Sequence, residues 1–128
     1  MTRKIIETAT APKAIGTYSQ AVQIGDMLFL SGQVGLDPNT MQMVSDDVTE
    51  QCHQVFKNLI AVLHAAKYDV LDVVKLTVYL KDLNHFAAIN EVMAMYFTTP
   101  YPARAAIEIS RLPKDALVEI DAIAVKGE

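Results

Sequence analysis

Arg104 is the residue in this sequence with the best chemistry for binding a small anion. It lies in the stretch Tyr101–Arg111, which reads YPARAAIEISR. Pro102 lacks a backbone donor and biases Tyr101 toward an extended conformation, so we expect a strand to begin here. A guanidinium held on a strand offers a planar fork that matches a carboxylate in two parallel hydrogen bonds. The alternative is a surface arginine whose stem lies over its neighbours.

Two further positions could contribute to a binding site or serve the fold alone. An expected strand runs into Ser31-Gly32-Gln33. Gly32 has no Cβ, so a ligand can approach its backbone N–H, although a strand glycine equally marks a bulge or close packing. Asn90 falls on the apolar stripe of an expected helix, and a buried amide needs either a structural partner or a ligand.

The cysteine and the histidines offer little for covalent or metal chemistry. Cys52 falls within an apolar helical stripe, which predicts a small buried hydrophobe rather than a nucleophile. His53 and His64 fall on the polar side of the same helix, and neither has a partner at a recognised zinc spacing. We therefore expect no metal site.

Hydrophobic periodicity predicts the elements that must position these residues. Helical spacing indicates one helix from Asp46 or Asp47 to about Ala66, and a second that is capped by Asp82 or Asn84. Period-two alternation and turn residues indicate strands at 4–7, 18–24, 27–33, 73–80, 104–110 and 117–126. Gly25-Asp26 joins the second and third of these strands as a tight hairpin turn.

Three details of the strands can be checked against a structure. Val74, Leu76, Val78 and Leu80 should share one face of their strand. The helix between the 73–80 strand and the Arg104 strand is a crossover, so these two strands should be parallel. The AIAV segment at 122–125 is apolar at every position, which favours a central strand covered on both sides.

Composition limits the class of protein. At 128 residues, the chain predicts a single domain, residues 1–128, able to bury a core without disulfides. Its 52% hydrophobic content suggests apolar surface that meets a partner subunit, while no apolar run is long enough to span a membrane. The net charge of -4 provides no overall basic field for nucleic acid. One cysteine and a mixed N-terminal segment, unlike a secretory signal, indicate a reducing intracellular compartment, the cytoplasm, or the mitochondrion or nucleus in a eukaryote.

Several motifs together resemble one known family. They are AIGTYSQAV, LSGQVGLDP, VVKLTVYLKDL, INEVM, YPARAA and RLPKDALVEIDAIAV. On their order and spacing, the sequence resembles the RidA/YjgF family of reactive-intermediate imine deaminases over nearly its whole length. The resemblance implies a chorismate-mutase-like α+β fold: a mixed sheet of about six strands, with two helices packed on one face. It also implies a homotrimer with one site at each subunit interface. The family's functional positions fall on Tyr18, Ser31, Gly32, Asn90, Arg104 and Glu119.

Two positions depart from the family's pattern. Thr17 stands where proline is usual, and Ala106 stands where many bacterial members have cysteine. Neither departure removes a group that the implied reaction needs, so only substrate preference near Ala106 is affected.

The implied reaction can be argued from chemistry. A 2-imino acid, left when a pyridoxal-phosphate enzyme eliminates water from serine or threonine, carries a carboxylate beside an electrophilic C=N carbon. Its hydrolysis needs a fork for the carboxylate, a placed water and a group that takes and returns protons. Arg104 can supply the fork. Glu119 can orient the water and act as base, then acid, if burial brings its pKa toward neutrality.

The remaining positions have supporting roles in this hypothesis. The Gly32 N–H, with Ser31 beside it, can donate to the carboxylate, while Tyr18 and Asn90 shape and close the pocket. The predicted activity is deamination of 2-aminoacrylate, 2-iminopropanoate and 2-iminobutanoate to 2-keto acids and ammonia. Protonated imines already react with water, so no cofactor is expected. Arg104, Glu119 and Tyr18 are the candidate catalytic residues.

Geometry adds one demand. The last strand should run antiparallel to the Arg104 strand, which places Arg104 and Glu119 toward opposite ends of the sheet, about 15 to 25 Å apart at ~3.3 Å per residue. Within one subunit they should not reach one small ligand. A neighbouring chain must then supply one of them, and a monomer should be inactive.

Two other classes of function remain open. A ribonuclease or translation inhibitor would need clustered cations interleaved with aromatic residues, whereas the lysines here are scattered, at Lys57, Lys67, Lys75, Lys81 and Lys114. A non-catalytic metabolite-binding or chaperone-like trimer would keep Arg104 and the cleft but would not depend on Glu119. Substitution of these two residues separates the three hypotheses.

Overall fold

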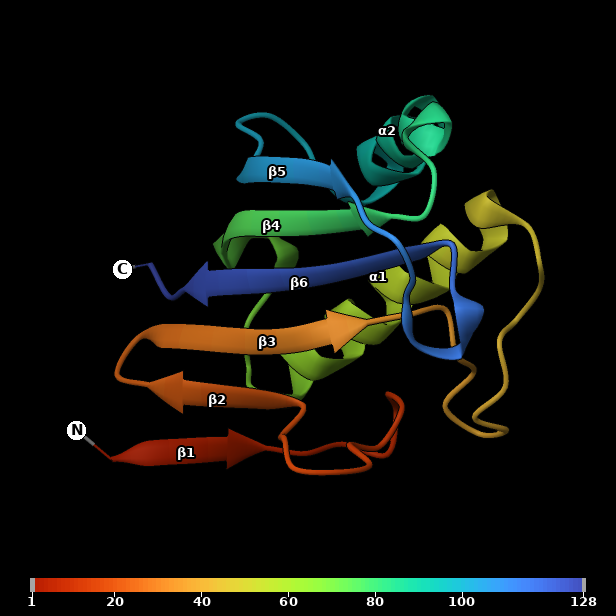
Figure 1. The fold of residues 1–128 in the computed structure, drawn as a ribbon. Coiled ribbons are helices and arrows are strands. Elements are labelled where there is room, and N and C mark those ends of the chain that lie inside the picture. Colours follow the sequence, from red (N-terminus) through yellow and green to blue (C-terminus); the bar gives the residue numbers. More distant parts are fainter. Residues whose placement is uncertain (1, 128) are drawn as a thin grey trace.

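A single mixed sheet organises residues 2–127, the part of the chain described in the computed structural model. Its strands are β1 (Arg3–Ile6), β2 (Ala21–Ile24), β3 (Met27–Gln33), β4 (Val73–Leu80), β5 (Ala103–Glu108) and β6 (Val118–Val125). They lie in the order β1-β2-β3-β6-β4-β5 (Figure 1). Neighbours are antiparallel except β4 and β5, which are parallel as predicted. Strands β2 and β5 are shorter than the predicted strands 18–24 and 104–110.

Helix α1 (Val48–Ala65) follows the sequence prediction closely. The Asp47 carboxylate caps it by accepting from the Glu50 N–H at 3.0 Å. Cys52 is fully buried, and burial raises the pKa of its thiol to about 12. The thiol therefore stays protonated and inert, as expected for a small buried hydrophobe.

Helix α2 (Phe86–Tyr96) corrects one prediction. A short 3₁₀ turn, η2 (Leu83–His85), precedes it, and Asp82 caps that turn. The buried residues of α2 are Ile89, Val92 and Met93. Val92 belongs to the buried arc, and Asn90 is therefore displaced to the exposed edge of the helix. Asn90 is not buried, contrary to expectation.

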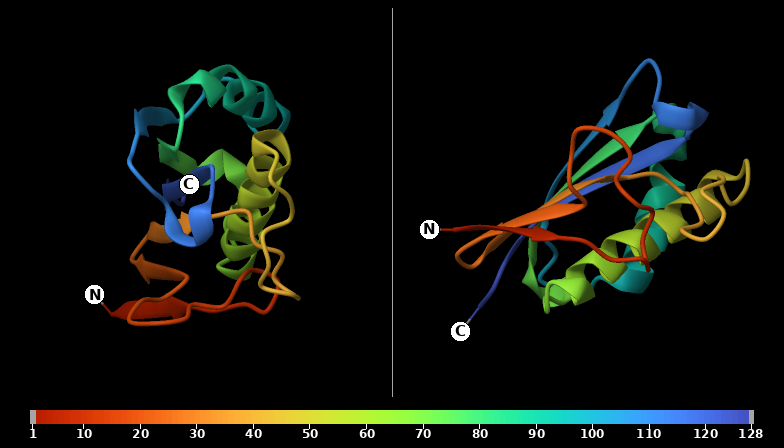
Figure 2. Two further views of the ribbon diagram at one scale, coloured as in Figure 1. Left: turned by 45° about the vertical axis from the view of Figure 1, so that its right-hand side comes forward. Right: turned by 90° about the horizontal axis from the view of Figure 1, so that it is seen from below.

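Both helices lie on the same face of the sheet (Figure 2). Against them β6 buries Val118, Ile120, Ala122 and Ala124, while the alternate residues are only half-buried. The prediction that AIAV is covered on both sides is therefore wrong for the single chain. No helix within residues 2–127 meets the length and hydropathy that a membrane span requires.

Strand β4 departs from simple alternation at its start. A register irregularity between Val73 and Lys75 interrupts its pairing with β6. Val73 is consequently buried, whereas Val74 is 45% exposed. The expected shared face holds for Leu76, Val78 and Leu80 but not for Val74. Two more 3₁₀ turns, η1 (Val70–Asp72) and η3 (Pro113–Asp115), precede β4 and β6.

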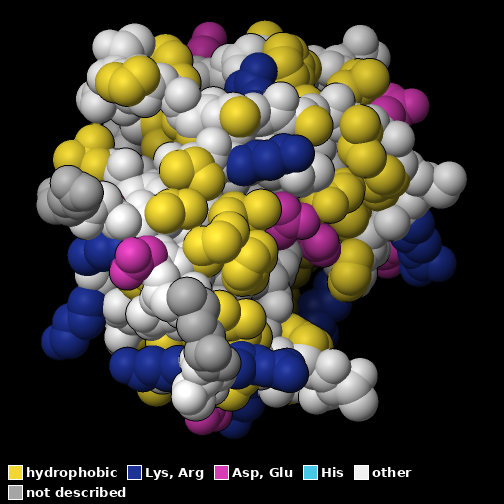
Figure 3. All heavy atoms as spheres, turned by 90° about the vertical axis from the view of Figure 1, so that its left-hand side faces the viewer, with side chains coloured by type: hydrophobic (Ala, Val, Ile, Leu, Met, Phe, Trp, Pro, Cys, Tyr) yellow, Lys and Arg dark blue, Asp and Glu magenta, His cyan; other side chains and the backbone are white. Residues whose placement is uncertain are grey.

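The sheet face opposite the helices, which we call the open face, exposes apolar side chains. Ile24, Met27, Phe29 and Ile107 are each between 38% and 45% exposed there. Figure 3 shows hydrophobic side chains scattered among charged ones at the end of the molecule that holds the chain termini. Single exposed apolar residues are ordinary, but several on one sheet face indicate an interaction surface.

Candidate active site

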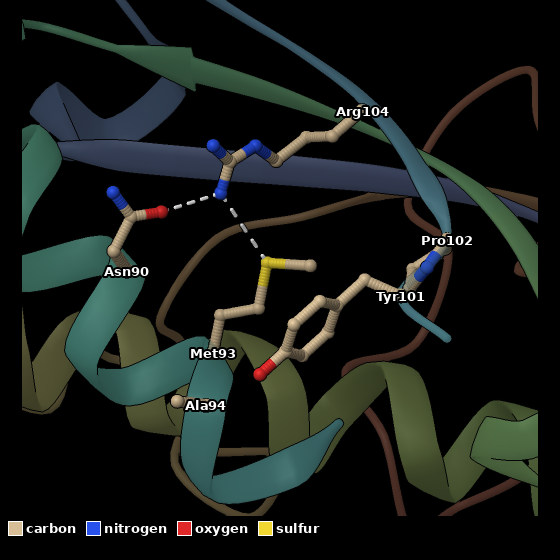
Figure 4. A pocket seen from close by; sticks show the side chains of 6 residues that line it. All are labelled: Asn90, Met93, Ala94, Tyr101, Pro102 and Arg104. Carbon is tan, nitrogen blue, oxygen red and sulfur yellow. Dashed lines mark hydrogen bonds between the residues drawn. The ribbon is translucent and has the colours of Figure 1, made fainter. Parts of the chain in front are cut away.

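Arg104 lies on the edge strand β5 with its side chain directed to the helix side of the sheet. It pairs in register with Leu76, which is fully buried under the helices. Its Nη1 donates to Asn90 Oδ1 at 2.6 Å and to Met93 Sδ at 3.6 Å (Figure 4). The guanidinium also lies over the Phe86 ring, 4.8 Å from its centroid. Helix α2 thus holds the arginine by three contacts.

A cavity of about 400 Å³, the Arg104 pocket, opens beside this guanidinium. Its lining residues are Asn90, Met93, Ala94, Tyr101, Pro102 and Arg104. Figure 4 shows the Tyr101 ring reaching from the segment before β5 toward α2. The pocket therefore has one cationic, polar end and one mostly apolar wall, which suits a small carboxylate with an apolar tail.

Glu119 lies on β6, opposite Tyr79 of β4, and is half-buried on the open face. A register shift between Leu30 and Gln33 marks a bulge in β3, which brings Gly32 against its side chain. A Cβ at Gly32 would lie only 2.5 Å from Glu119 Oε2. The glycine is therefore both a bulge and a packing accommodation, two of the alternatives that the sequence left open.

Burial raises the pKa of Glu119 above its ordinary value of 4.5, and the nearby Asp121 carboxylate raises it further. Asp121 accepts a hydrogen bond from the Tyr79 hydroxyl at 3.0 Å. Within residues 2–127, no lysine or arginine forms an ion pair with Glu119. A carboxyl without a compensating cation holds its proton more tightly, which suits it to exchange protons.

A second cavity of about 470 Å³, the Glu119 pocket, contains this carboxyl. Tyr18, Gly32, Lys13 and Lys114 are among the other residues that line it. Tyr18 is 54% exposed, at the end of the loop before β2. Its hydroxyl-bearing ring is therefore accessible to a ligand or to another chain.

Ser31 bonds to the backbone of the segment before β2. Its hydroxyl donates to the Ser19 carbonyl at 2.5 Å, and its backbone N–H donates to the Gln20 carbonyl at 3.0 Å. These bonds fasten the segment that carries Tyr18 to β3. The hydroxyl oxygen keeps only acceptor capacity, and Ser31 lines neither pocket.

The side chains of Arg104 and Glu119 project from opposite faces of one sheet. Arg104 is level with Leu76 and Glu119 with Tyr79 on the shared neighbour β4. That offset is about 10 Å along the strands at ~3.3 Å per residue, so the two residues are closer to the same end than expected. The sheet itself separates them. The structure brings Asn90 to Arg104 and Tyr18 and Gly32 to Glu119, but not the two groups together.

Phe86 and Met93 are contacts of Arg104 that sequence reasoning did not identify. Their spacing carries the signal, since Phe86, Asn90 and Met93 follow the i, i+4, i+7 pattern of one helix face. Within the described residues, no cluster of three or more His, Cys, Asp or Glu side chains could hold a metal ion.

Comparison with known proteins places this chain in a family. Residues 8–126 match the family model described as endoribonuclease L-PSP. The chain is 53% identical to a RutC family protein of Pyrococcus horikoshii, over 97% of this chain and 98% of that protein. It is 50% identical to the mouse protein named 2-iminobutanoate/2-iminopropanoate deaminase, over 98% and 93% of the two chains.

Solved structures agree with the sequence comparisons. The crystal structure of Escherichia coli TdcF with bound serine matches with a TM-score of 0.92 and 45% identity, covering 97% of this chain and 99% of that one. RidA from the Antarctic bacterium Psychrobacter matches with a TM-score of 0.93 and 46% identity, covering 96% and 99%. Members of the family thus include proteins named as imine deaminases. The chain belongs to the endoribonuclease L-PSP family, the RidA/YjgF family that its motifs resemble.

Proposed function

We propose that this protein hydrolyses small reactive 2-imino acids to 2-keto acids and ammonia, at sites shared between the subunits of a homotrimer. The observation that carries the proposal is the pairing of two unlike pockets. One presents an arginine with no acidic partner, and the other presents a carboxyl with a raised pKa and no cationic partner within residues 2–127. A small anion with a hydrolysable C=N bond needs both. The deaminase name carried by the mouse relative supports the same reaction.

The chemistry follows from the two side chains. Arg104 holds the substrate carboxylate, which fixes the C=N carbon beside it. Ionised Glu119 accepts a proton from a water as the water oxygen bonds to that carbon, giving a tetrahedral carbinolamine. Glu119 then returns the proton to nitrogen, the C–N bond breaks and ammonia leaves. Loss of the remaining hydroxyl proton leaves the 2-keto acid, so one water is consumed for each ammonia released.

The other predicted residues support these steps. The backbone N–H of Gly32, an exposed residue, donates to the substrate carboxylate, and Tyr18 closes the pocket around the small molecule. Asn90 positions Arg104 through the 2.6 Å hydrogen bond rather than by shaping a buried pocket. The raised pKa of Glu119 brings its basicity closer to the working pH, where a group that both takes and returns a proton is most effective.

Assembly completes the site. The exposed apolar side chains of the open face supply the contact surface for neighbouring subunits, and Glu119 lies on that same face. A neighbour that covers this face can bring its own Arg104 pocket to the Glu119 pocket. Each trimer interface then contains one complete site, since closed symmetry repeats the same contact around the ring.

The test is complementation between two inactive variants. Arg104→Ala and Glu119→Gln chains are each assayed alone, coupled to a serine or threonine dehydratase, for ammonia and keto-acid release beyond buffer hydrolysis. After unfolding and refolding as an equal mixture, about a quarter of the shared sites should be intact, because each needs one half from each variant. No recovered activity in mixed trimers, or no activity in the wild type, would contradict the proposal.

A ribonuclease activity is the second candidate, because the family model carries that description. The same pair of variants distinguishes it. RNA cleavage that survives both substitutions, without imine turnover in the wild type, would favour the ribonuclease. Keto-acid binding without turnover in the wild type would instead indicate a metabolite-binding trimer.

A further inference from the structure

The Arg104 guanidinium uses only one of its terminal nitrogens for contacts within residues 2–127. Nη1 carries two N–H groups, and its two acceptors are Asn90 Oδ1 at 2.6 Å and Met93 Sδ at 3.6 Å. Figure 4 shows both interactions leaving the same nitrogen, toward α2. The donor capacity of Nη1 is therefore fully taken up by the protein.

Phe86 restricts the guanidinium from a second direction. Its ring lies 4.8 Å from the guanidinium carbon, so it covers one flat side of the cation. Because Phe86, Asn90 and Met93 lie on one face of α2, a single rigid helix sets both the plane and the rotation of the group. A carboxylate must then approach in the plane of the guanidinium, along an edge whose N–H groups have no acceptor within residues 2–127.

That free edge consists of Nε and Nη2. Within residues 2–127, neither nitrogen donates to any protein acceptor. Their N–H groups are parallel, as two-point binding of a carboxylate requires. We propose that the substrate carboxylate binds Arg104 along the Nε–Nη2 edge, and that Met93 is a positioning residue that selects this edge by occupying Nη1. The inference rests on the proposed function, since it names the binding geometry of the same substrate.

The thioether matters because it is the weaker of the two Nη1 acceptors and the less accessible to water. Met93 is only 6% exposed, so its sulfur stays where the helix places it. If the sulfur is removed, one Nη1 proton is released, and the carboxylate can bind end-on across Nη1 and Nη2 instead. The imine carbon would then be rotated away from the position that the Nε–Nη2 edge gives it. Met93 thus affects the orientation of the substrate without contacting the reacting atoms.

Nuclear magnetic resonance can observe the proposed edge directly. The chain has three arginines, Arg3, Arg104 and Arg111, so its Nε–H spectrum is simple, and Arg104→Lys identifies the Arg104 signal by its loss. On titration of the assembled ¹⁵N-labelled protein with 2-oxobutanoate, the Arg104 Nε–H proton should shift downfield and saturate, while the Arg3 and Arg111 signals stay in place. Binding by calorimetry without this shift overturns the proposal, and so does a failure of 2-oxobutanoate to bind.

Substitution of Met93 tests the selection of the edge. Met93→Leu keeps the volume but removes the acceptor, so the carboxylate can also bind across Nη1 and Nη2. The Nε–H shift at saturation should therefore shrink, while the affinity for 2-oxobutanoate stays close to that of the wild type. Met93→Gln restores an acceptor of similar length and should recover the full shift. Met95→Leu, on the exposed side of α2, is the matched control and should change neither.

The outcomes separate this inference from the proposed function. If Met93→Leu binds 2-oxobutanoate as tightly as the wild type, with the full Nε–H shift, the positioning role is wrong while hydrolysis can still stand. If the shift and its dependence on Met93 are observed in a protein that does not hydrolyse 2-iminobutanoate, the binding geometry holds and the proposed reaction fails. A merely structural role would lower binding for both Leu and Gln variants.

Discussion

The Arg104 pocket and the Glu119 pocket differ in how far water reaches their ionisable groups. Arg104 is exposed on an edge strand, and a helix holds it through an amide, a thioether and an aromatic ring. Glu119 is half-buried in the middle of the sheet, against the backbone of a bulge, with a second carboxylate nearby. Exposure lets the guanidinium keep its charge, whereas partial burial raises the free energy of the ionised Glu119 carboxylate.

The difference indicates a division of work. A guanidinium stays charged in any environment, so it can bind an anion from an exposed and rigid position. A carboxyl exchanges protons near neutral pH only when desolvation raises its pKa, so it must be partly buried. Arg104 and Glu119 fit these two requirements on opposite faces of one sheet, which is why we propose a complete site between chains.

The largest effect should come from Glu119→Gln. Without a group to take and return the proton, turnover of 2-iminobutanoate should fall by about 10² to 10⁴, the usual value of general acid–base catalysis. Affinity for 2-oxobutanoate should stay at the wild-type level, because the Arg104 pocket is unchanged. Ammonia release in the dehydratase assay measures the turnover, and calorimetry measures the affinity. A rate within a few-fold of the wild type would remove Glu119 from the chemistry.

Arg104→Ala should act on binding. Loss of a charge-assisted, two-point contact should weaken 2-oxobutanoate binding at least about 30-fold, or about 2 kcal/mol. Arg111→Ala is the control, since Arg111 is also exposed but pairs with Asp115 on the surface. Calorimetry measures the affinity of each variant for 2-oxobutanoate. Equal affinities would show that the cation in the pocket is not the anchor.

Gly32→Ala should disturb the Glu119 pocket without removing any chemical group. The new methyl would overlap Glu119 Oε2, so the carboxyl must move and turnover should fall about tenfold. Binding of 2-oxobutanoate should change much less. Gly127→Ala is the control, because a Cβ there meets nothing within 4 Å. A fall in affinity as large as the fall in rate would indicate that the methyl disturbs the contact between the Gly32 N–H and the carboxylate rather than the position of Glu119.

Asn90→Ala should have a smaller effect on the Arg104 pocket. It removes one hydrogen bond to the guanidinium, so affinity for 2-oxobutanoate should fall about fivefold, with kcat unchanged. Asn84→Ala, at an exposed position of the turn before α2, serves as the control. A change in kcat rather than in affinity would place Asn90 in the reaction.

The smallest effect should be a difference in the free energy of unfolding between the wild type and Glu119→Gln. Because its folded pKa is raised above 4.5, the native chain holds this proton more tightly than the unfolded chain does. The stability it contributes is present below the unfolded pKa and is lost as pH rises through the folded pKa. Glu119→Gln should therefore be more stable than the wild type at neutral pH, with no such advantage below pH 4.5. Thermal denaturation across that pH range measures it, and a pH-independent difference would show that desolvation of the carboxylate is not the cause.

Local chemistry accounts for what could be predicted. The Asp47 cap, the buried face with Cys52 and the turn at Gly25 each depend on residues within a few positions, so composition and spacing suffice. Packing between distant segments accounts for the errors. The position of Val74 depends on a bulge against β6, and the exposure of Asn90 depends on which arc of α2 meets the sheet.

The candidate site shows the same division. Its residue types follow from motifs, so Arg104, Glu119, Gly32 and Tyr18 could be named from the sequence. Their surroundings could not be named, because pKa, contact and face arise only when segments far apart in the chain meet. Gly32 and Glu119 touch across a sheet that brings β3 beside β6, and Met93 reaches Arg104 across the crossover between β4 and β5.

The sequence by itself thus determined the family, the strands and helices, and the chemical groups available for a reaction. Only the tertiary structure decided that the guanidinium and the carboxyl lie on opposite faces of the sheet, and that one is exposed while the other is desolvated. The physical reason is that side-chain direction and burial depend on the register of neighbouring strands and on the face that the helices cover. Neither quantity is a property of any short stretch of chain.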